Sequence, residues 1–280
     1  MRFTKMQGCG NDYIYVDCFA ETVPEEPSSL AKRISDRHYG VGSDGLILIE
    51  PSSRADAFMH MFNADGSEGA MCGNGVRCVA KYLYDHGLVP RGRRAVRVDT
   101  RSGVREIAFR AEDGRAAELT VDMGRPALTG ALPEDISILG MPLRFIGVDV
   151  GNPHAVYFLE DNAALDAKSV SELELARLGK ALEMCGRFPE GVNAEFVNIV
   201  SPREINFRVW ERGSGETLAC GTGTVAAVYA GICAGKLENE VLVHLPGGDL
   251  GVRYEPASGH CFLSGGAVEV FSGEYPTHGA

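Results

Sequence analysis

The chain has 280 residues, of which 45% are hydrophobic and 23% charged, the balance of a globular protein with one large domain or two ordinary ones. Its formal net charge of -11 gives an acidic surface that repels phosphate backbones, so nucleic acid is not an expected partner. The N-terminus lacks the apolar core of a signal peptide, and the longest apolar stretch, 225–234, is too short to span a bilayer, so we expect a cytoplasmic protein with no membrane contact.

Short strands are predicted along most of the chain, because apolar and polar residues alternate between turn-forming residues. In the first half the predicted strands are 13–17, 46–49, 57–62, 95–99, 106–111 and 117–123. In the second half they are 145–150, 155–159, 195–200, 205–210, 241–245 and 267–271.

Helices are fewer. A period of 3.6 residues predicts them over 30–37, 74–86, 171–184 and 222–234. Gly87 and Gly235 stand where two of these helices should stop. The Gly- and Pro-rich segment 124–135 has neither period and is predicted to connect two halves of the chain.

The pattern Cys-Gly-x-Gly occurs twice, beginning at Cys72 and at Cys220, each time before an apolar helix. Nine residues before the two cysteines, Asn63 and Glu211 each close an apolar strand. Between strand and cysteine, each copy has a Gly- and Ser-containing turn followed by a glutamate. This matched order of strand, turn, glutamate, cysteine and helix predicts an internal duplication.

A cysteine just before a helix lies in the positive field of the helix N-terminus, which favours the thiolate. Glycines at the same place let a carboxylate approach the backbone N–H groups closely. Two such units facing each other would put a thiol on either side of one bound carboxylate. That arrangement suits inversion at the carbon next to the carboxylate, with one thiolate removing a proton and the other thiol supplying one.

Three other interpretations stay open from the residues alone. The two cysteines could form the reversible disulfide of a non-catalytic thiol sensor. The patterns at 40–45 and 221–226 fit a nucleotide-binding glycine motif but lack its strand–helix context. A pyridoxal enzyme would need a lysine beside a phosphate cradle, and none of the six lysines has that context.

The chain has no C-x-x-C, HExxH or P-loop motif, so we expect no metal and no cofactor.

Polar residues at the ends of apolar runs are the remaining candidates for a site. Asn11, Asn63, Asn152 and Asn193 could supply amide groups that recognise a zwitterion, and Glu211 with Arg212 could supply one partner of each charge. His154 could tune a thiol.

Seven segments of the sequence resemble the diaminopimelate epimerase family, and they lie in order between residues 5 and 248. They are "KMQGCGNDYIYVD", "RHYGVGSDGL", "FNADGSEGAMCGNGVRC", "GNPHAV", "NAEFVNIV", "WERGSGETLACGTGT" and "LPGG". Paired Cys-Gly-x-Gly segments also occur in proline racemase-like enzymes, whereas "FNADGSE" and "ERGSGET" are more specific to the epimerase.

The resemblance implies an α+β fold of two pseudo-symmetric halves, each a mostly antiparallel β-sheet wrapped around a central helix. One half would comprise residues 1–118 and 266–280 and carry Cys72; the other would comprise 119–265 and carry Cys220. The implied activity is interconversion of LL- and meso-2,6-diaminopimelate, without pyridoxal phosphate or metal, in lysine and peptidoglycan precursor synthesis, by a protein that can form a homodimer. The alternative is a proline or hydroxyproline racemase or epimerase of the same fold.

The family's functional positions carry over onto matching residues of this chain. Cys72 and Cys220 would be the catalytic acid–base pair, and His154 and Glu211 would tune the thiols. Substrate contacts would come from Asn11, Asn63, Asn152, Asn193, Glu211 and Arg212, and from the helix-start residues Gly73, Asn74, Gly221 and Thr222. One departure is Gly45, where some family members carry a glutamine that reaches the substrate; here a neighbour, a backbone group or water would replace it.

Overall fold

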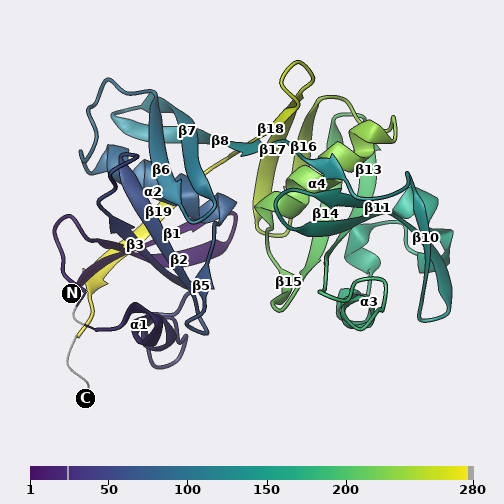
Figure 1. Cartoon of the computed structure of the whole chain (residues 1–280), viewed down its shortest axis with the longest axis horizontal. Coiled ribbons are helices and arrows are strands. Elements are labelled where there is room, and N and C mark those ends of the chain that lie inside the picture. The colour runs from purple at the N-terminus through teal and green to yellow at the C-terminus, as the bar shows by residue number, and fades with distance from the viewer. Residues whose placement is uncertain (24, 277–280) are drawn as a thin grey trace. The chain divides into compact units, whose positions relative to one another are not determined.

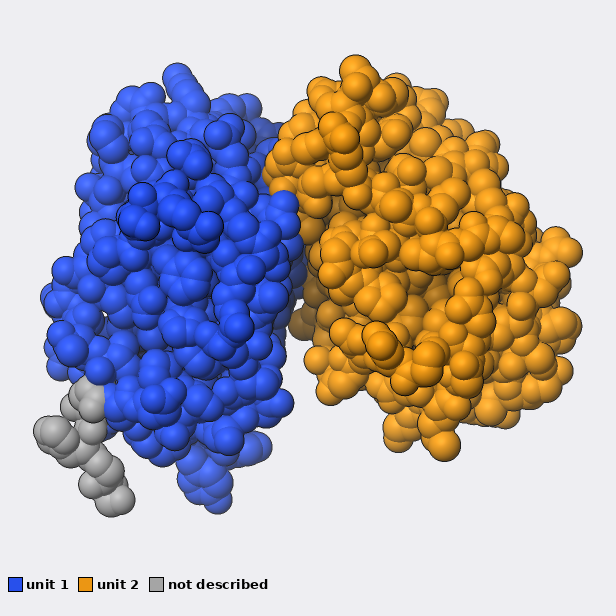
Figure 2. Space-filling model, viewed as in Figure 1, with its two compact units in different colours: residues 1–121, 265–280 blue, residues 122–264 orange. Residues whose placement is uncertain are grey.

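The structure is a computed structural model that describes residues 1–23 and 25–276. Strands dominate it and helices are few (Figure 1). The chain divides into two compact units, which Figure 2 colours separately: unit 1 has residues 1–121 and 265–280, and unit 2 has residues 122–264. The sequence predicts these boundaries after residues 118 and 265, and residues 277–280 of its first half lie outside the described residues.

Unit 1 is a mostly antiparallel sheet around one buried helix. Its strands are β1 (Arg2–Gly8), β2 (Asn11–Asp17), β3 (Gly45–Glu50), β4 (Ala57–Asn63), β5 (Glu68–Gly69), β6 (Ala95–Thr100), β7 (Gly103–Glu112), most of β8 (Arg115–Gly124), and β19 (Val268–Glu274). β2 runs parallel to β3 and β4 parallel to β6, while the other neighbours are antiparallel. The helix α2 (Gly73–Asp85) packs against β1, β2, β6 and β7, and α1 (Pro27–Ile34) against β3 and β4.

Unit 2 repeats this topology. Its strands are β9 (Ala127–Leu128), β10 (Glu134–Ile138), β11 (Met141–Asp149), β12 (Pro153–Phe158), β13 (Asn193–Ser201), β14 (Glu204–Glu211), β15 (Gly215–Thr217), β16 (Glu240–Leu245), β17 (Gly248–Glu255) and β18 (His260–Gly265). β12 runs parallel to β13 and β14 parallel to β16, and the other pairs are antiparallel. The central helix is α4 (Gly221–Cys233), and α3 (Leu175–Glu183) lies between β12 and β13 in sequence, as α1 does between β2 and β3.

The matching order of pairings confirms the predicted α+β fold of two pseudo-symmetric halves. The central helices also end alike: Gly87 and Gly235 have φ of 74° and 68°, in the left-handed region where glycine has no steric penalty. The backbone N–H of the next residue donates a hydrogen bond back across the turn, at 2.9 Å for Leu88 and at 2.8 Å for Lys236. Both helices therefore stop in the hydrogen-bonded Schellman geometry that the two glycines predict.

Several boundaries differ from the sequence prediction, among them the starts of two helices and the predicted connection between the halves. Helix α1 begins at Pro27 rather than residue 30, because the fixed φ of proline suits the first helical position. Helix α3 begins at Leu175 rather than residue 171, since the preceding residues form a separate short 3-10 helix, Val170–Glu172. The predicted connection 124–135 contains β9 and the start of β10, which both pair with β11.

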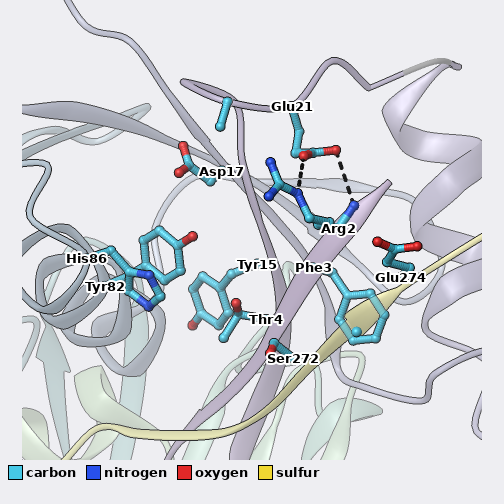
Figure 3. Close-up of a pocket in the computed structure, with 12 residues that line it drawn as sticks. Arg2, Phe3, Thr4, Tyr15, Asp17, Glu21, Tyr82, His86, Ser272 and Glu274 are labelled. Atoms are coloured by element: carbon cyan, nitrogen blue, oxygen red, sulfur yellow. Dashed lines mark hydrogen bonds and ion pairs between the residues drawn. The ribbon is translucent and has the colours of Figure 1, made fainter.

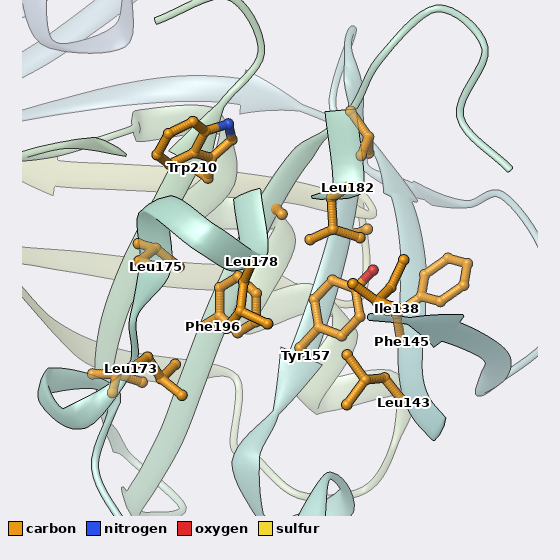
Figure 4. Packing of buried hydrophobic residues seen from close by; sticks show 14 of the residues in the cluster. Ile138, Leu143, Phe145, Tyr157, Leu173, Leu175, Leu178, Leu182, Phe196 and Trp210 are labelled. Atoms are coloured by element: carbon orange, nitrogen blue, oxygen red, sulfur yellow. The ribbon is translucent and has the colours of Figure 1, made fainter. Parts of the chain in front are cut away.

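The core of unit 2 is rich in aromatic side chains (Figure 4). Tyr157 of β12 and Phe196 of β13 stack with ring centroids 5.1 Å apart, and Leu178 and Leu182 of α3 pack onto this cluster. Trp210, the residue before Glu211 in β14, belongs to the same cluster. Helix α3 thus packs against the end of β14, the strand that carries the predicted site residue Glu211.

Gly179 of α3 is the point at which this helix meets Trp210. A Cβ at residue 179 would lie 2.1 Å from Cδ2 of that indole ring. Gly179→Ala should gain about 1 kcal/mol of helix propensity but cost about 3 kcal/mol of overpacking, a net destabilisation of about 2 kcal/mol in urea unfolding. Lys180→Ala, at an exposed position of the same helix, should change stability little, and equal stability of the two variants would refute this packing.

Candidate active site

Cys72 stands at the N-terminus of α2, as predicted. It has an extended backbone and is the N-cap residue of the helix. Its sulfur accepts a hydrogen bond from the backbone N–H of Gly75 at 3.3 Å. The thiol donates to Oδ1 of Asn11 at 3.2 Å. The structure therefore puts the Cys72 sulfur in the field of the helix terminus and brings Asn11 to it.

Asp44 orients the Asn11 amide, and sequence reasoning missed it. Its Oδ2 accepts from Asn11 Nδ2 at 2.9 Å and from the backbone N–H of Asp12 at 3.1 Å. With its nitrogen held, Asn11 turns its oxygen to the thiol. Burial, and then the neighbouring Asp12 carboxylate, raises the pKa of Asp44. Its place next to Gly45, inside "GVGSDGL", is the signal that could have identified it.

Arg77 is a second residue that sequence reasoning missed. Its side chain is fully buried in α2. The guanidinium donates to Oδ1 of Asn74 at 2.9 Å and to the carbonyl oxygens of Gly73 and Gly266 at 3.3 and 3.4 Å. It therefore fixes the buried first turn of α2, including both predicted helix-start residues. An arginine inside an apolar helix, three residues after an asparagine, is the signal in the sequence.

Asn63 and Gly45 lie directly opposite each other in the β3–β4 pair. Asn63 Nδ2 donates to Ser67 Oγ at 2.9 Å, so this amide braces the turn after β4.

Cys220 stands at the N-terminus of α4, in the place that Cys72 has in unit 1. Its thiol is buried and lies 3.5 Å from Oγ1 of Thr222. Burial raises the pKa of Cys220 well above its usual value, and the carboxylates of Glu211 and Glu195 raise it further. The protonated thiol is the favoured form of Cys220 here, which suits it to donate a proton.

The link between Glu211 and this thiol gives a testable prediction. Glu211 ends β14, where it accepts a hydrogen bond from Thr217. Glu211→Gln removes one carboxylate that opposes the thiolate, so the pKa of Cys220 should fall. Alkylation of Cys220 by iodoacetamide, followed by mass spectrometry, should then reach its midpoint at lower pH than in the wild type.

Glu216→Gln is the matched control for this experiment. Glu216 lies in the same hairpin, but its carboxylate pairs with Arg208 at 2.7 Å, and the charges that raise the pKa of Cys220 most are those of Glu211 and Glu195. The midpoint should not move in this variant. An unchanged or higher midpoint in Glu211→Gln would contradict the electrostatic link.

His154 and Asn152 form a buried hydrogen-bonded chain with Glu195, a residue that the sequence does not single out. Nδ1 of His154 lies 2.7 Å from Oε1 of Glu195, and Nε2 lies 3.0 Å from Oδ1 of Asn152. The side chains of His154 and Glu195 are both 0% exposed. Burial is the main cause that raises the pKa of Glu195.

Asn193 and Arg212 are held at neighbouring strand ends. Asn193 lies opposite His154 in the β12–β13 pair. Its Oδ1 accepts from the backbone N–H of Arg212 at 2.9 Å, and the Arg212 guanidinium donates to the carbonyl of Glu190 at 2.8 Å. The predicted site residues of unit 2 thus lie together near the start of α4.

The strand registers place the predicted residues at equivalent positions of the two units. Tyr13 pairs with Gly45 as His154 pairs with Asn193. By this register the equivalent pairs are Asn11 and Asn152, Gly45 and Asn193, and Asn63 and Glu211. The starts of α2 and α4 add Cys72 and Cys220, Gly73 and Gly221, and Asn74 and Thr222. Each unit therefore builds the same constellation of a helix-start cysteine and flanking polar side chains.

A separate pocket in unit 1 contains none of these residues (Figure 3). It has a volume of 510 Å³ and is lined by Arg2, Tyr15, Tyr82, His86 and Glu274, among others. Tyr82 lies in the last turn of α2 and His86 is its C-cap, whereas Cys72 is the N-cap at the opposite end. The pocket is therefore distinct from the candidate site.

Within residues 1–23 and 25–276, no helix combines the length and the apolar composition that a membrane span requires. No group of three or more His, Cys, Asp or Glu side chains in these ranges could hold a metal ion.

Comparisons with known proteins give two kinds of similarity. The family model described as "Diaminopimelate epimerase" matches residues 3–129 and 146–270. The diaminopimelate epimerase of Agathobacter rectalis is 46% identical, covering 98% of this chain and 99% of that one; the enzyme of Desulfovibrio desulfuricans is 44% identical, covering 98% of each.

Solved structures with low sequence identity share the fold. A probable proline racemase from Agrobacterium radiobacter K84 superposes with a TM-score of 0.74 at 16% identity, covering 98% of this chain and 92% of that one. A hydroxyproline epimerase from Agrobacterium vitis, with bound trans-4-hydroxy-L-proline, gives 0.73 at 16% identity, covering 98% and 91%.

Proposed function

The chain belongs to the diaminopimelate epimerase family, and from this premise we propose that it interconverts LL- and meso-2,6-diaminopimelate. The reaction would use no cofactor and would serve lysine and peptidoglycan precursor synthesis. The observation that carries the proposal is the repeated constellation: in each unit a cysteine begins the central helix, with amide and charged side chains at matched strand ends.

In the proposed mechanism Cys72 and Cys220 act on one α-carbon of the substrate. One cysteine, as thiolate, takes the α-proton, so that an S–H bond forms as the C–H bond breaks. The other cysteine, as thiol, gives its proton to the opposite face of the same carbon. The two thiols exchange roles in the reverse direction, and no net oxidation or reduction occurs.

Negative charge builds on the substrate carboxylate when the α-proton leaves. The first N–H groups of α2 and α4, at Gly73, Asn74, Gly221 and Thr222, have no partner within their helices and are suited to stabilise that charge. This stabilisation is needed because the acidity of an α-proton lies far below that of a thiol near pKa 8.5.

The remaining polar residues would recognise the charged groups of the substrate. Asn11, Asn63, Asn152 and Asn193 offer both donors and acceptors, while Glu211 suits an ammonium group and Arg212 a carboxylate. Diaminopimelate carries an ammonium and a carboxylate at each end, which explains a site with more charged and amide groups than a single amino-acid head requires.

A steady-state assay tests this proposal against the alternative of a proline or hydroxyproline racemase of the same fold. The purified protein is given LL-diaminopimelate, L-proline or trans-4-hydroxy-L-proline. Because buried polar groups reject a substrate that cannot pair with them, we expect kcat/KM for diaminopimelate to exceed the others at least ~10³-fold. Equal or faster turnover of either proline would contradict the proposal.

The family resemblance also leads us to propose a cytoplasmic homodimer. Val268, Val270 and Phe271 of β19 expose about half of their surfaces, which leaves an apolar area that a second copy could cover. Light scattering of the purified protein should give the mass of a dimer rather than the 30.0 kDa of one chain.

A further inference from the structure

Glu195 occupies a position at which the other unit carries a hydrocarbon side chain. It lies two residues after Asn193 in β13, as Ile47 lies two residues after Gly45 in β3. Both face the second glycine of their central helix: a Cβ on Gly75 would lie 2.9 Å from Ile47 Cδ1, and one on Gly223 would lie 2.7 Å from Glu195 Oε1. The fold itself therefore accepts an apolar residue here.

The carboxylate is also a costly choice for packing alone. Glu195 is 0% exposed, and burial of a carboxylate is unfavourable unless its oxygens are hydrogen-bonded. One oxygen, Oε1, contacts His154 Nδ1, but Oε2 has no hydrogen-bond partner among the described residues. We therefore expect Glu195 to have a role beyond packing. Its hydrogen bond to His154 indicates that this role is exerted on the imidazole ring.

The hydrogen-bonded chain fixes a proton on the far side of the imidazole. Oδ1 of Asn152 can only accept, so Nε2 of His154, 3.0 Å away, carries a proton. Glu195 then pairs with Nδ1 in one of two ways. Either its carboxylate accepts a hydrogen bond from an imidazolium, or its protonated carboxyl group donates a hydrogen bond to the neutral ring. In both arrangements the Asn152 oxygen points to the ring, and its NH₂ group is left to donate elsewhere.

We infer that Glu195 is a positioning residue for substrate binding, because through His154 it holds the Asn152 NH₂ group toward a substrate carboxylate. This inference rests on the proposed function. Without the carboxylate, Nε2 can lose its proton and become an acceptor. The Asn152 amide would then turn, donate to Nε2, and present its oxygen to the substrate carboxylate, which it repels.

The test uses Glu195→Gln in the full-length protein, because glutamine has nearly the same shape and pairs with either tautomer of the ring. Long-range ¹H–¹⁵N spectra of the histidine-labelled protein report the proton on Nε2 of His154, with the signal assigned from a His154→Phe sample. In the wild type we expect the shift of a protonated Nε2 at neutral pH, and in Glu195→Gln a shift toward the unprotonated form.

Kinetics with LL-diaminopimelate give the second readout. A misplaced binding group should raise KM, and we expect kcat/KM to fall about 10- to 100-fold in Glu195→Gln. Glu195→Asp keeps the carboxylate, so it should retain part of the activity and the chemical shift of a protonated Nε2. If Glu195→Gln does not fold, Glu195→Asp is the variant on which both measurements are made.

Glu204→Gln is the matched control. Glu204 pairs with His244 at 2.8 Å but begins β14, whereas Glu211 ends that strand near the site. This variant should leave both readouts unchanged. A wild-type Nε2 shift together with a wild-type KM in Glu195→Gln would overturn the inference. If the wild-type protein does not epimerise diaminopimelate, the proposed function fails, while the spectra still decide whether Glu195 controls the ring.

Discussion

Replacing Cys72 or Cys220 by alanine is expected to lower kcat for diaminopimelate epimerisation at least ~10³-fold. Each substitution removes the only group proposed to move a proton on one face of the α-carbon. Because both cysteines precede their helices rather than fill the core of a sheet, the fold should survive either change. Epimerisation followed by chiral chromatography, with circular dichroism of each variant, measures both expectations.

Two other cysteines on the same helices serve as controls. Cys78 of α2 is buried and Cys233 of α4 is half-buried, and neither begins its helix. Cys78→Ala should cost about 1 kcal/mol of stability through lost packing, and both control variants should retain nearly full activity. Wild-type turnover in Cys220→Ala would show that the two-thiol account is wrong.

Gly45→Gln is expected to destabilise the protein by about 3 kcal/mol without raising its activity. The substitution restores the glutamine that some family members carry, yet a Cβ at residue 45 would lie 2.1 Å from the Phe62 carbonyl oxygen and 2.7 Å from Cε1 of Tyr13. Backbone atoms cannot move aside as a flexible side chain can. In this chain the Tyr13 ring and the neighbouring strand fill the space that a side chain at residue 45 would need.

Gly251→Ala is the control for a glycine within a strand. Gly251 lies in β17, where an added Cβ would approach nothing closer than Ser264 Cβ at 3.7 Å, an ordinary contact. The urea concentration at the unfolding midpoint of Gly251→Ala should stay near that of the wild type. If Gly45→Gln is as stable as Gly251→Ala and also more active, then the structure misplaces Tyr13 and β4.

Local patterns were sufficient to predict the elements that carry the site. The glycines after Cys72 and Cys220 and the stops at Gly87 and Gly235 are signals that depend only on backbone geometry, so they predict α2 and α4 to within one residue at each end. The strands next to them alternate clearly because one face is buried against a central helix.

Other strands carry weaker patterns. β1 contains Thr4, Lys5 and Gln7, and β17 begins with Gly and Asp, so neither shows a clean apolar alternation. Their place in the sheet is set by partners far along the chain, such as the pairing of β1 with β19. Pairings of this kind are not encoded in any short window of sequence.

The supporting residues of the site could not be predicted for a related reason. Arg77 and Glu195 each interrupt an apolar run, which usually marks a solvent-exposed face. Arg77 is buried because strands surround the central helix α2 that carries it, and Glu195 is buried because its side chain faces the central helix α4. Which face of a strand or helix is covered depends on tertiary structure, so a buried charge and an exposed one look alike in sequence.

The most direct test of the two-thiol mechanism is incubation with LL-diaminopimelate in deuterium oxide, sampled at low conversion. We predict that the meso product carries one deuterium at the inverted carbon while the recovered LL substrate carries none. The thiol that donates has exchanged with solvent and delivers deuterium, whereas the thiol that takes the α-proton holds hydrogen from the substrate and can return only that hydrogen. Meso product that retains the original proton, or deuterium in recovered LL substrate before any meso product forms, would contradict the account.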